Sequence, residues 1–377
     1  MIILQKKRLI KIMINQNVVR RTRRSLLKRA AHAIMAAGDV IMLTIADIAR
    51  EMGISTATVS NALSGKGRVS EEKRRQIQEA ARAMGYDMRR VRSALPRRSV
   101  AVVVEALSIR FCVAIAEGMW REARENGYQV KLFNLDLLRD DSDYNPPRER
   151  VEAALAELVP QLGQDTLGLV YISQYPRDLT GVMPPLPFPV VYAYCYTQDS
   201  APSVNTDDQQ GAYLAVRHLL DQGKRRIAMI SGPINSMPMT KRFSGYQRAL
   251  IDAGEAVDLN LVRLGDWDID HSREHMRQLL QLDPRPDGVF CQSDHIAIGV
   301  CRAILERGLR IPRDIAVVGF DDYEFAAIVS PSLTTIAQPL EEIGRTAFAQ
   351  LQRILEKQKV ESANILLKAT LVRRESC

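Results

Sequence analysis

The 377-residue chain has little of what membrane and metal-binding proteins depend on. Its five cysteines show no C-x-x-C or other metal-ligand spacing, and we interpret them as buried or incidental thiols in a reducing cytosol. No apolar run approaches the roughly 18 residues that a membrane helix needs. The first residues lack the apolar core and cleavage site of a signal peptide. These absences predict a cytoplasmic protein.

Signals of catalysis are missing as well. No nucleophile elbow, phosphate-binding loop or metal-ligand spacing occurs in the sequence. Asp321, Asp322 and His295 can be imagined as an acid/base set, but nothing accompanies them that would complete an active site. We therefore expect neither an enzyme nor a cofactor.

Charge is distributed unevenly along the chain. Residues 1–41 hold ten Lys or Arg and one acidic residue, and residues 42–98 hold twelve and six. The remainder, residues 99–377, is acidic, with 30 basic and 37 acidic side chains. A basic N-terminal part is attracted to the phosphates of nucleic acid, whereas an acidic body is repelled by them.

Residues 42–86 have the pattern of three short capped helices. Thr44, Ser55 and Ser70 are suitable N-caps, and Gly53 suits a tight turn because it adopts a left-handed backbone at low cost. Each helix has an apolar stripe at helical spacing, formed by Ile45, Ile48, Ala49 and Met52, then Val59, Ala62 and Leu63, then Ile77, Ala80, Ala81 and Met84. Such a unit is typical of a helix-turn-helix.

The middle helix leaves a small polar face outward, formed by Thr56, Ala57, Ser60 and Asn61. Small side chains let a helix approach base edges closely, and Asn61 can pair bidentately with an adenine. An ordinary three-helix bundle with a merely hydrated face is the alternative. Tight helix junctions and the basic side chains of the connecting loop and third helix argue against it. These side chains are Lys66, Arg68, Lys73, Arg74 and Arg75.

From Val100 onward, short β-rich runs alternate with stretches of helical length. The runs are VAVVVE, YQVKLFN, LGLVYIS, PVVYAY, RRIAMIS, DGVFCQS and IAVVGF. This alternation is typical of parallel sheets with helices on both faces, which bind ligands at the carboxyl ends of their strands.

The segment TIADIAREMGISTATVSNALSGKGRVSEEKRRQIQEAARAMGY resembles the N-terminal domain of the lac repressor (LacI/GalR) family of bacterial regulators. The resemblance continues in PSVNTDDQQGAYLAVRHLLDQGKRRIAMISGP, KRFSGYQRAL, GDWDIDHS, DGVFCQSDHIAIG, IPRDIAVVGFDD, SPSLTTIAQPLEEIG and LVRRES. It implies an N-terminal all-α helix-turn-helix domain joined by a hinge to an α/β body. That body would resemble periplasmic binding proteins, with two doubly wound parallel-sheet lobes.

The expected domains follow from the extent of this resemblance. Residues 42–86 form the helix-turn-helix, residues 87–99 the hinge, and residues 100–377 a two-lobed effector-binding and dimerisation domain. Because the family pattern begins only near Met42, we interpret residues 1–41 as a start-site artefact. A basic arm that strengthens DNA binding is the alternative.

The resemblance also implies which residues contact DNA. Leu95 takes the place of a hinge leucine that wedges into the central minor groove, with docking on the body as its alternative role. The hinge departs from the family because Met88 and Arg89 replace Pro-Asn and Pro96 ends any helix at or before Leu95. Base contacts are expected from Thr56, Ala57 and Asn61, and phosphate contacts from Thr44, Ser55, Ser60 and Arg68.

Three residues of the body suit a sugar ligand. Trp267 offers a flat indole to apolar C–H faces, Arg242 offers a guanidinium fork, and Asp321 accepts from two hydroxyls. Plain packing is the alternative for Trp267, and structural ion pairs are the alternative for the other two. The resemblance implies that the matching residues hold the effector in the family. It further places four residues at pocket positions: Phe111, Asp207, Ser293 and Gln338.

Two further polar residues lie near these positions. Arg110 is an unusual cation beside the pocket aromatics and favours an acidic or phosphorylated ligand. Asp294 is expected to cap the following helix in preference to contacting a ligand.

The expected function is that of a sequence-specific, DNA-binding transcriptional regulator, in the form of a repressor. A homodimer would bind a near-palindromic double-stranded operator, under allosteric control by a sugar or sugar phosphate. The chain ends at Cys377 without a leucine heptad tail, which favours a dimer over a helix-tethered tetramer. A solute-binding or sensor protein without DNA regulation is the alternative, although it would need a signal peptide and no helix-turn-helix.

Overall fold

The computed structural model describes residues 45–64, 69–84, 98–138, 145–360 and 364–377. The chain divides into two compact units, Met1–Pro96 and Arg97–Cys377. Several residues of the sequence predictions lie outside the described ranges. They are the extension 1–41, the cap Thr44, the phosphate contact Arg68, and the hinge residues 87–97 with Leu95.

The first unit contains the predicted helices, α3 (Ile45–Met52), α4 (Thr56–Ser64) and α5 (Glu71–Ala83). Their buried apolar side chains form one small core, made of Ile48, Ala49, Val59, Ala62, Ile77 and Ala81. All six belong to the three stripes read from the sequence. The other stripe residues are half-buried, and Ile45, Met52, Leu63 and Met84 pack against this core.

Short-range hydrogen bonds fix the junctions between these helices. The Ser55 hydroxyl accepts from the amide of Thr58 at 3.1 Å, and the Ser70 hydroxyl accepts from the amide of Lys73 at 3.4 Å. Gly53 adopts φ 64° in the turn after α3, where a side chain would be strained. The predicted N-caps Ser55 and Ser70 and the glycine turn are therefore confirmed.

The second unit is an α/β body whose first lobe, lobe 1, comprises the described residues 98–138, 145–206, 340–360 and 364–367. Its sheet has the order β11-β5-β4-β3-β1-β2 with neighbouring strands all parallel. The strands are β1 (Ser99–Val104), β2 (Gln129–Asn134), β3 (Thr166–Ile172), β4 (Val190–Ala193), β5 (Ser203–Thr206) and β11 (Asn364–Leu367).

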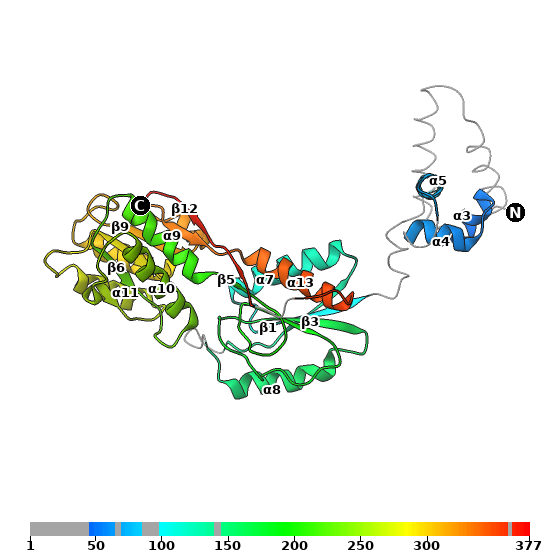
Figure 1. Ribbon diagram of the computed structural model, residues 1–377, viewed down its shortest axis with the longest axis horizontal. Coiled ribbons are helices and arrows are strands. Elements are labelled where there is room, and N and C mark those ends of the chain that lie inside the picture. Colours follow the sequence, from blue (N-terminus) through cyan, green and yellow to red (C-terminus); the bar gives the residue numbers. More distant parts are fainter. Residues whose placement is uncertain (1–44, 65–68, 85–97, 139–144, 361–363) are drawn as a thin grey trace, which may run out of the picture. The chain divides into compact units, whose positions relative to one another are not determined.

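Helices cover both faces of the lobe 1 sheet. Alternate residues of β1 point to opposite faces. Val100, Val102 and Val104 pack with α7 (Arg110–Glu125) and α13 (Leu340–Leu355). Ala101 and Val103 pack with α8 (Arg148–Leu158), which continues into the 3-10 turn Val159–Gln161. Figure 1 shows α8 on one side of the sheet and α7 with α13 on the other.

Lobe 2 comprises residues 208–337 and 370–377. Its sheet has the order β12-β10-β9-β8-β6-β7 and is parallel except for β12. The strands are β6 (Ile227–Ile230), β7 (Val262–Arg263), β8 (Gly288–Cys291), β9 (Ala316–Asp321), β10 (Thr334–Ala337) and β12 (Thr370–Val372).

The lobe 2 sheet is also covered on both faces. The helices α9 (Asp208–Asp221) and α10 (Met237–Asp252) pack on one face, and α11 (Ile269–Leu279) and α12 (Asp294–Glu306) on the other. Two 3-10 turns, Leu259–Leu261 and Glu324–Ala327, lie in its loops. The seven strands read from the sequence are all present, and the doubly wound prediction is confirmed.

Close helix crossings stabilise both lobes. A Cβ added to Gly344 of α13 would overlap the carbonyl oxygen of Ile115 in α7. In lobe 2, a Cβ added to Gly299 of α12 would overlap the carbonyl oxygen of Ile269 in α11. Glycine at these positions lets the paired helices approach backbone to backbone.

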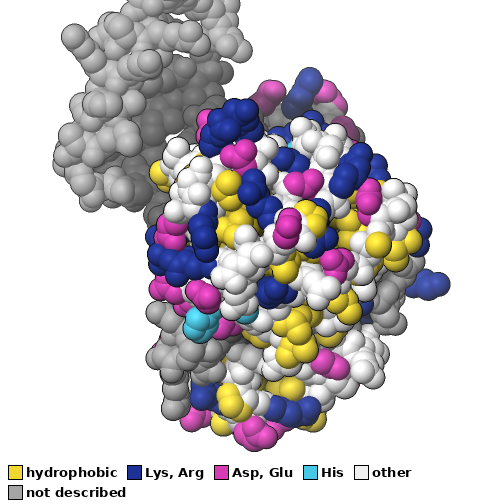
Figure 2. Space-filling model, turned by 90° about the vertical axis from the view of Figure 1, so that its left-hand side faces the viewer, with side chains coloured by type: hydrophobic (Ala, Val, Ile, Leu, Met, Phe, Trp, Pro, Cys, Tyr) yellow, Lys and Arg dark blue, Asp and Glu magenta, His cyan; other side chains and the backbone are white. Residues whose placement is uncertain are grey.

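The chain crosses between the lobes three times, at Asp207, at Gln338 and Pro339, and at Lys368 and Ala369. Figure 2 shows one face of the body with basic and acidic side chains interspersed, unlike the single-sign surface of a DNA-binding face. Among the described residues, no helix is long and apolar enough to span a membrane.

Candidate effector site and recognition helix

A cavity of about 450 Å³ lies between the two lobes, at the carboxyl ends of their parallel strands. This volume lies in the usual range for small-molecule sites. Five of the seven predicted effector residues line it, namely Phe111, Arg242, Trp267, Ser293 and Asp321.

Arg242 lies on α10 and is buried at the cavity wall, with 3% of its side chain exposed. Its Nε contacts Asp208 Oδ1 at 2.8 Å, its Nη2 lies 3.6 Å from Asp321 Oδ1, and its Nη1 donates to the carbonyl oxygen of Gln292. The guanidinium also stacks on the Phe320 ring at 3.6 Å. Burial acts to lower the pKa of Arg242, but the charges of Asp208 and Asp321 outweigh this effect. The pKa is therefore raised overall, and the side chain stays charged. The ion-pair alternative is thus realised in a residue that also faces the cavity.

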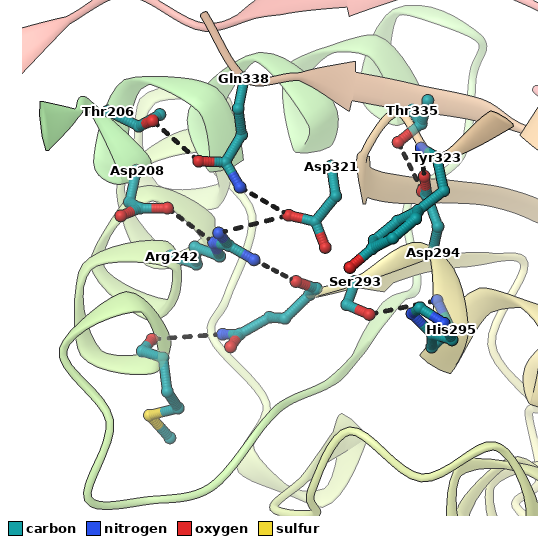
Figure 3. A network of polar contacts seen from close by, with 12 residues as sticks. Thr206, Asp208, Arg242, Ser293, Asp294, His295, Asp321, Tyr323, Thr335 and Gln338 are labelled. Atoms are coloured by element: carbon teal, nitrogen blue, oxygen red, sulfur yellow. Dashed lines mark hydrogen bonds and ion pairs between the residues drawn. The ribbon is translucent and has the colours of Figure 1, made fainter. Parts of the chain in front are cut away.

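Asp321 ends β9 and is held by a polar network that Figure 3 displays. Gln338 Nε2 donates to Asp321 Oδ1 at 2.7 Å and to the Tyr194 hydroxyl at 3.1 Å, and Gln338 Oε1 accepts from Thr206 at 2.8 Å. Among the described residues, Gln338 and Arg242 both reach the same oxygen of Asp321. Burial raises the pKa of Asp321 to about 6, although Arg242 acts to lower it. At neutral pH the carboxylate is mostly charged and suited to accept ligand hydroxyls.

Two aromatic residues come from opposite walls. Trp267 follows β7 and rests on Gly232, where an added Cβ would overlap the indole ring. Phe111 lies in the first turn of α7, with its ring centroid 5.5 Å from that of Tyr194 and 5.6 Å from that of Tyr323. These rings give the cavity apolar faces beside the polar network.

The first residues of α12 act differently from the prediction. Ser293, not Asp294, is the N-cap, because its hydroxyl accepts from the amide of His295 at 3.1 Å. The capping role expected of Asp294 is therefore wrong. Asp294 is fully buried and instead accepts from the Tyr323 amide at 2.8 Å and the Thr335 hydroxyl at 2.6 Å.

Asp207 and Gln338 are not among the cavity-lining residues. Both lie where the chain crosses between the lobes. Asp207 caps α9 by accepting from the Gln210 amide at 3.0 Å, and its neighbour Asp208 pairs with Arg242. The carboxylate that pairs with Arg242 is thus one residue further along the chain than the predicted Asp207.

Sequence reasoning missed several lining residues, chiefly Gln174, Tyr175, Tyr194, His295 and Tyr323. Four of them follow the carboxyl ends of strands: Gln174 and Tyr175 follow β3, Tyr194 follows β4, and Tyr323 follows β9. Reading each strand end as a ligand position would have found these four.

The recognition helix α4 presents the predicted face to solvent. Thr56, Ala57 and Asn61 are exposed, and Ser60 is half-buried. Ser55, expected to contact phosphate, is exposed and caps α4 with its hydroxyl. This small polar face stands on the first unit's apolar core, as a DNA-reading helix does.

Comparison with known proteins agrees with both parts of the chain. Residues 44–88 match the profile of bacterial regulatory proteins of the lacI family, and residues 216–377 match that of a periplasmic binding protein-like domain. The HTH-type transcriptional repressor CytR of Escherichia coli (strain K12) is 33% identical over 339 residues, which cover 88% of this chain and 96% of CytR.

Solved structures extend the comparison. The transcriptional regulator CelR in complex with cellobiose is 29% identical, with a TM-score of 0.58 and coverage of 89% of this chain and 100% of CelR. The lac repressor dimer bound to operator and the anti-inducer ONPF is 25% identical, with a TM-score of 0.62 and coverage of 89% and 98%.

A helix-turn-helix unit and a two-lobed body with a polar cavity define a ligand-responsive DNA-binding regulator. The relatives are transcriptional repressors, and this chain is a transcriptional regulator rather than an enzyme. It belongs to the lacI family of bacterial regulatory proteins.

Proposed function

We propose that this regulator binds a small uncharged polar effector of the sugar type in the cavity between its lobes. The observation that carries the proposal is the buried pairing of Arg242 with Asp208 and Asp321 beside the rings of Trp267 and Phe111. Carboxylate oxygens suit ligand hydroxyls, and aromatic faces suit the apolar side of a sugar ring. CelR, a relative in structure, is known in complex with the sugar cellobiose.

Charge balance favours an uncharged effector over an acidic one. Arg242 is matched by two carboxylates, and Arg110 pairs with Glu324 at 3.0 Å. Burial lowers the pKa of His295, which leaves the ring neutral near pH 7. Each arginine at the cavity therefore already has a carboxylate partner, and we replace the hypothesis of an acidic or phosphorylated ligand by that of a neutral sugar.

On DNA, we propose a homodimer in the cytoplasm that binds a near-palindromic operator. Support comes from the lac repressor, which is known as a dimer on its operator. Thr56, Ala57 and Asn61 would read base edges, Leu95 would enter the central minor groove, and the phosphate contacts would be Thr44, Ser55, Ser60 and Arg68. The domain limits stay as proposed from the sequence, 42–86, 87–99 and 100–377, with 1–41 as an extension.

Genomic selection of DNA fragments by the purified full-length protein tests this function. The selection is repeated with neutral sugars and with their phosphates. We expect one near-palindromic motif whose enrichment a neutral sugar alters and its phosphate does not. Enrichment or loss with the phosphate alone would contradict the charge argument, and no motif under any condition would contradict DNA regulation.

Asn61→Ala tests whether the recognition helix α4 reads a base pair. Because Asn61 is exposed, its loss should leave the fold intact. We expect discrimination at one base pair of each half-site to fall by about 1–3 kcal/mol. Uniform weakening on all sequences would assign Asn61 to a phosphate contact instead.

A further inference from the structure

Arg110 connects the two lobes at the edge of the cavity. It is the first residue of α7 in lobe 1, and all of its polar contacts recorded in the described residues reach lobe 2. Its Nη1 and Nη2 donate to the carbonyl oxygens of Asp321 and Asp322 at 3.4 and 2.9 Å, and its Nε donates to Glu324 Oε1 at 3.0 Å. The guanidinium also lies 5.0 Å from the centroid of the Tyr323 ring. One side chain therefore holds four consecutive residues of the other lobe.

The backbone that Arg110 contacts is unusual. Asp321 and Asp322 have φ values of 109° and 53°, in the region that favours glycine. Such a conformation persists only where surrounding contacts hold it. Within lobe 2, Arg374 donates to the Asp322 carboxylate at 2.7 Å, and the amide of Tyr323 donates to Asp294 at 2.8 Å. The two carbonyl oxygens at the turn itself are bound from lobe 1.

This turn also carries a proposed ligand group. The Asp321 side chain points to Gln338 and Arg242, while its carbonyl oxygen accepts from Arg110 (Figure 3 shows the side-chain part of this arrangement). Arg110 of lobe 1 thus contacts the backbone of this residue, while Gln338 and Arg242 contact its side chain. A shift of lobe 1 away from lobe 2 would release the carbonyl contacts and free the strained turn.

We propose that Arg110 is a positioning residue that holds the lobes together without effector and, through the Asp321-Asp322 turn, fixes the orientation of the Asp321 carboxylate. The role of Arg110 in effector binding rests on the proposed function, whereas its contact with lobe 2 is independent of that function. The guanidinium fork matters more than its ion pair, because Glu324 is 75% exposed and water screens that charge. Arg110 thereby makes lobe closure and the geometry of the ligand carboxylate interdependent.

Fluorine NMR of the full-length protein labelled with 5-fluorotryptophan tests this proposal without DNA or effector. The chain has two tryptophans, Trp120 and Trp267, and Trp120→Phe assigns their signals. Trp267 reports on closure because its ring lies edge-on to Tyr175 of lobe 1, with centroids 6.4 Å apart. In Arg110→Met we expect the Trp267 signal to move toward that of free 5-fluorotryptophan, while the Trp120 signal stays in place.

Two further variants separate the fork from the charge. Glu324→Gln removes the ion pair but keeps the carbonyl contacts, so its Trp267 signal should match the wild type. Arg110→Lys keeps the charge but loses the fork, so its signal should move in the same direction as in Arg110→Met. It also serves if the Met variant does not fold.

Circular dichroism confirms that each variant is folded. An unchanged Trp267 signal in both folded Arg110 variants would overturn the proposal. A shift in Glu324→Gln as large as in Arg110→Met would overturn it too, because closure would then depend on the ion pair. A failed operator selection would leave this result untouched, since no DNA or effector enters the measurement.

Discussion

The two lobes contribute different chemistry to one cavity. Lobe 2 supplies the buried pair Arg242 and Asp321, whose partner Asp208 belongs to the same lobe. Lobe 1 supplies mainly rings, among them Phe111 and Tyr194. Under the proposed function, hydroxyl groups of the effector would therefore be recognised largely by lobe 2, and lobe 1 would supply the facing aromatic wall. Such a division keeps the polar site organised before binding and so lowers the cost of ordering it.

The largest expected effect compares the same substitution in both lobes. Arg242→Met leaves two buried carboxylates without their cation, and we expect the free energy of unfolding to fall by about 3–5 kcal/mol. Arg110→Met removes the half-exposed partner of Glu324, and we expect the free energy of unfolding to fall by less than about 1 kcal/mol. Urea unfolding followed by circular dichroism measures both. Equal losses would mean that the lobes do not differ in how their arginines are embedded.

A second pair of substitutions compares the helix packing of the two lobes. Gly344→Ala in lobe 1 and Gly299→Ala in lobe 2 would each place a methyl group against a backbone carbonyl of the facing helix. We expect each variant to lose about 1–3 kcal/mol of stability, because helix backbones cannot yield as a flexible side chain does. Thermal unfolding of the two variants side by side checks this. Tolerance at one site alone would show that its helix pair can separate.

The third comparison concerns the contributions of the two aromatic walls to effector affinity, and its expected effect is smaller. Trp267 is seated on Gly232 within lobe 2, whereas Phe111 reaches the cavity from lobe 1. For the sugar identified by operator selection, we expect Trp267→Ala to weaken binding about tenfold, equivalent to about 1.4 kcal/mol. Phe111→Ala should weaken it less. Isothermal titration measures both, and a larger loss at Phe111 would reverse the assignment of the main platform.

The fourth comparison concerns a pH dependence of stability that arises from a buried group of lobe 2. Burial, with Asp321 as a lesser cause, raises the pKa of Asp294 from 3.8 to about 8. The folded state therefore holds a proton that the unfolded chain releases, so this group's contribution is full below about pH 4 and is lost as pH rises to 8.

Asp294→Asn removes this titration and keeps both hydrogen bonds, since its amide can donate to Thr335 and accept from Tyr323. We expect the stability of the variant to decline less than that of the wild type between pH 5 and 8. Melting temperatures across that range provide the comparison. Parallel pH profiles would mean that Asp294 titrates normally in the folded protein.

Sequence reasoning predicted the periodic parts of this molecule best. The stripes in α3, α4 and α5 and the seven strands read from the sequence follow from local patterns of residue type. Short strands such as β7, and the edge strands β11 and β12, carry no such pattern because partners far away in the chain determine them. For the site, residue type predicted Arg242, Trp267 and Asp321, all three of which line the cavity. It did not separate Asp207 from Asp208, since only the path of the crossing decides which carboxylate pairs with Arg242.

The three crossings between the lobes also order events during synthesis. Lobe 1 begins to leave the ribosome first, yet α13, with Ile343, Ala347, Phe348 and Leu351 in its core, is made only near the end. Until then the part of the lobe 1 sheet face that α13 covers stays exposed beside α7, while most of lobe 2 has already been made. Lobe 2 is completed later still, by Ala369 and β12, so neither lobe has its full core before β11 and Ala369 are made, and apolar surface of both lobes stays exposed until then.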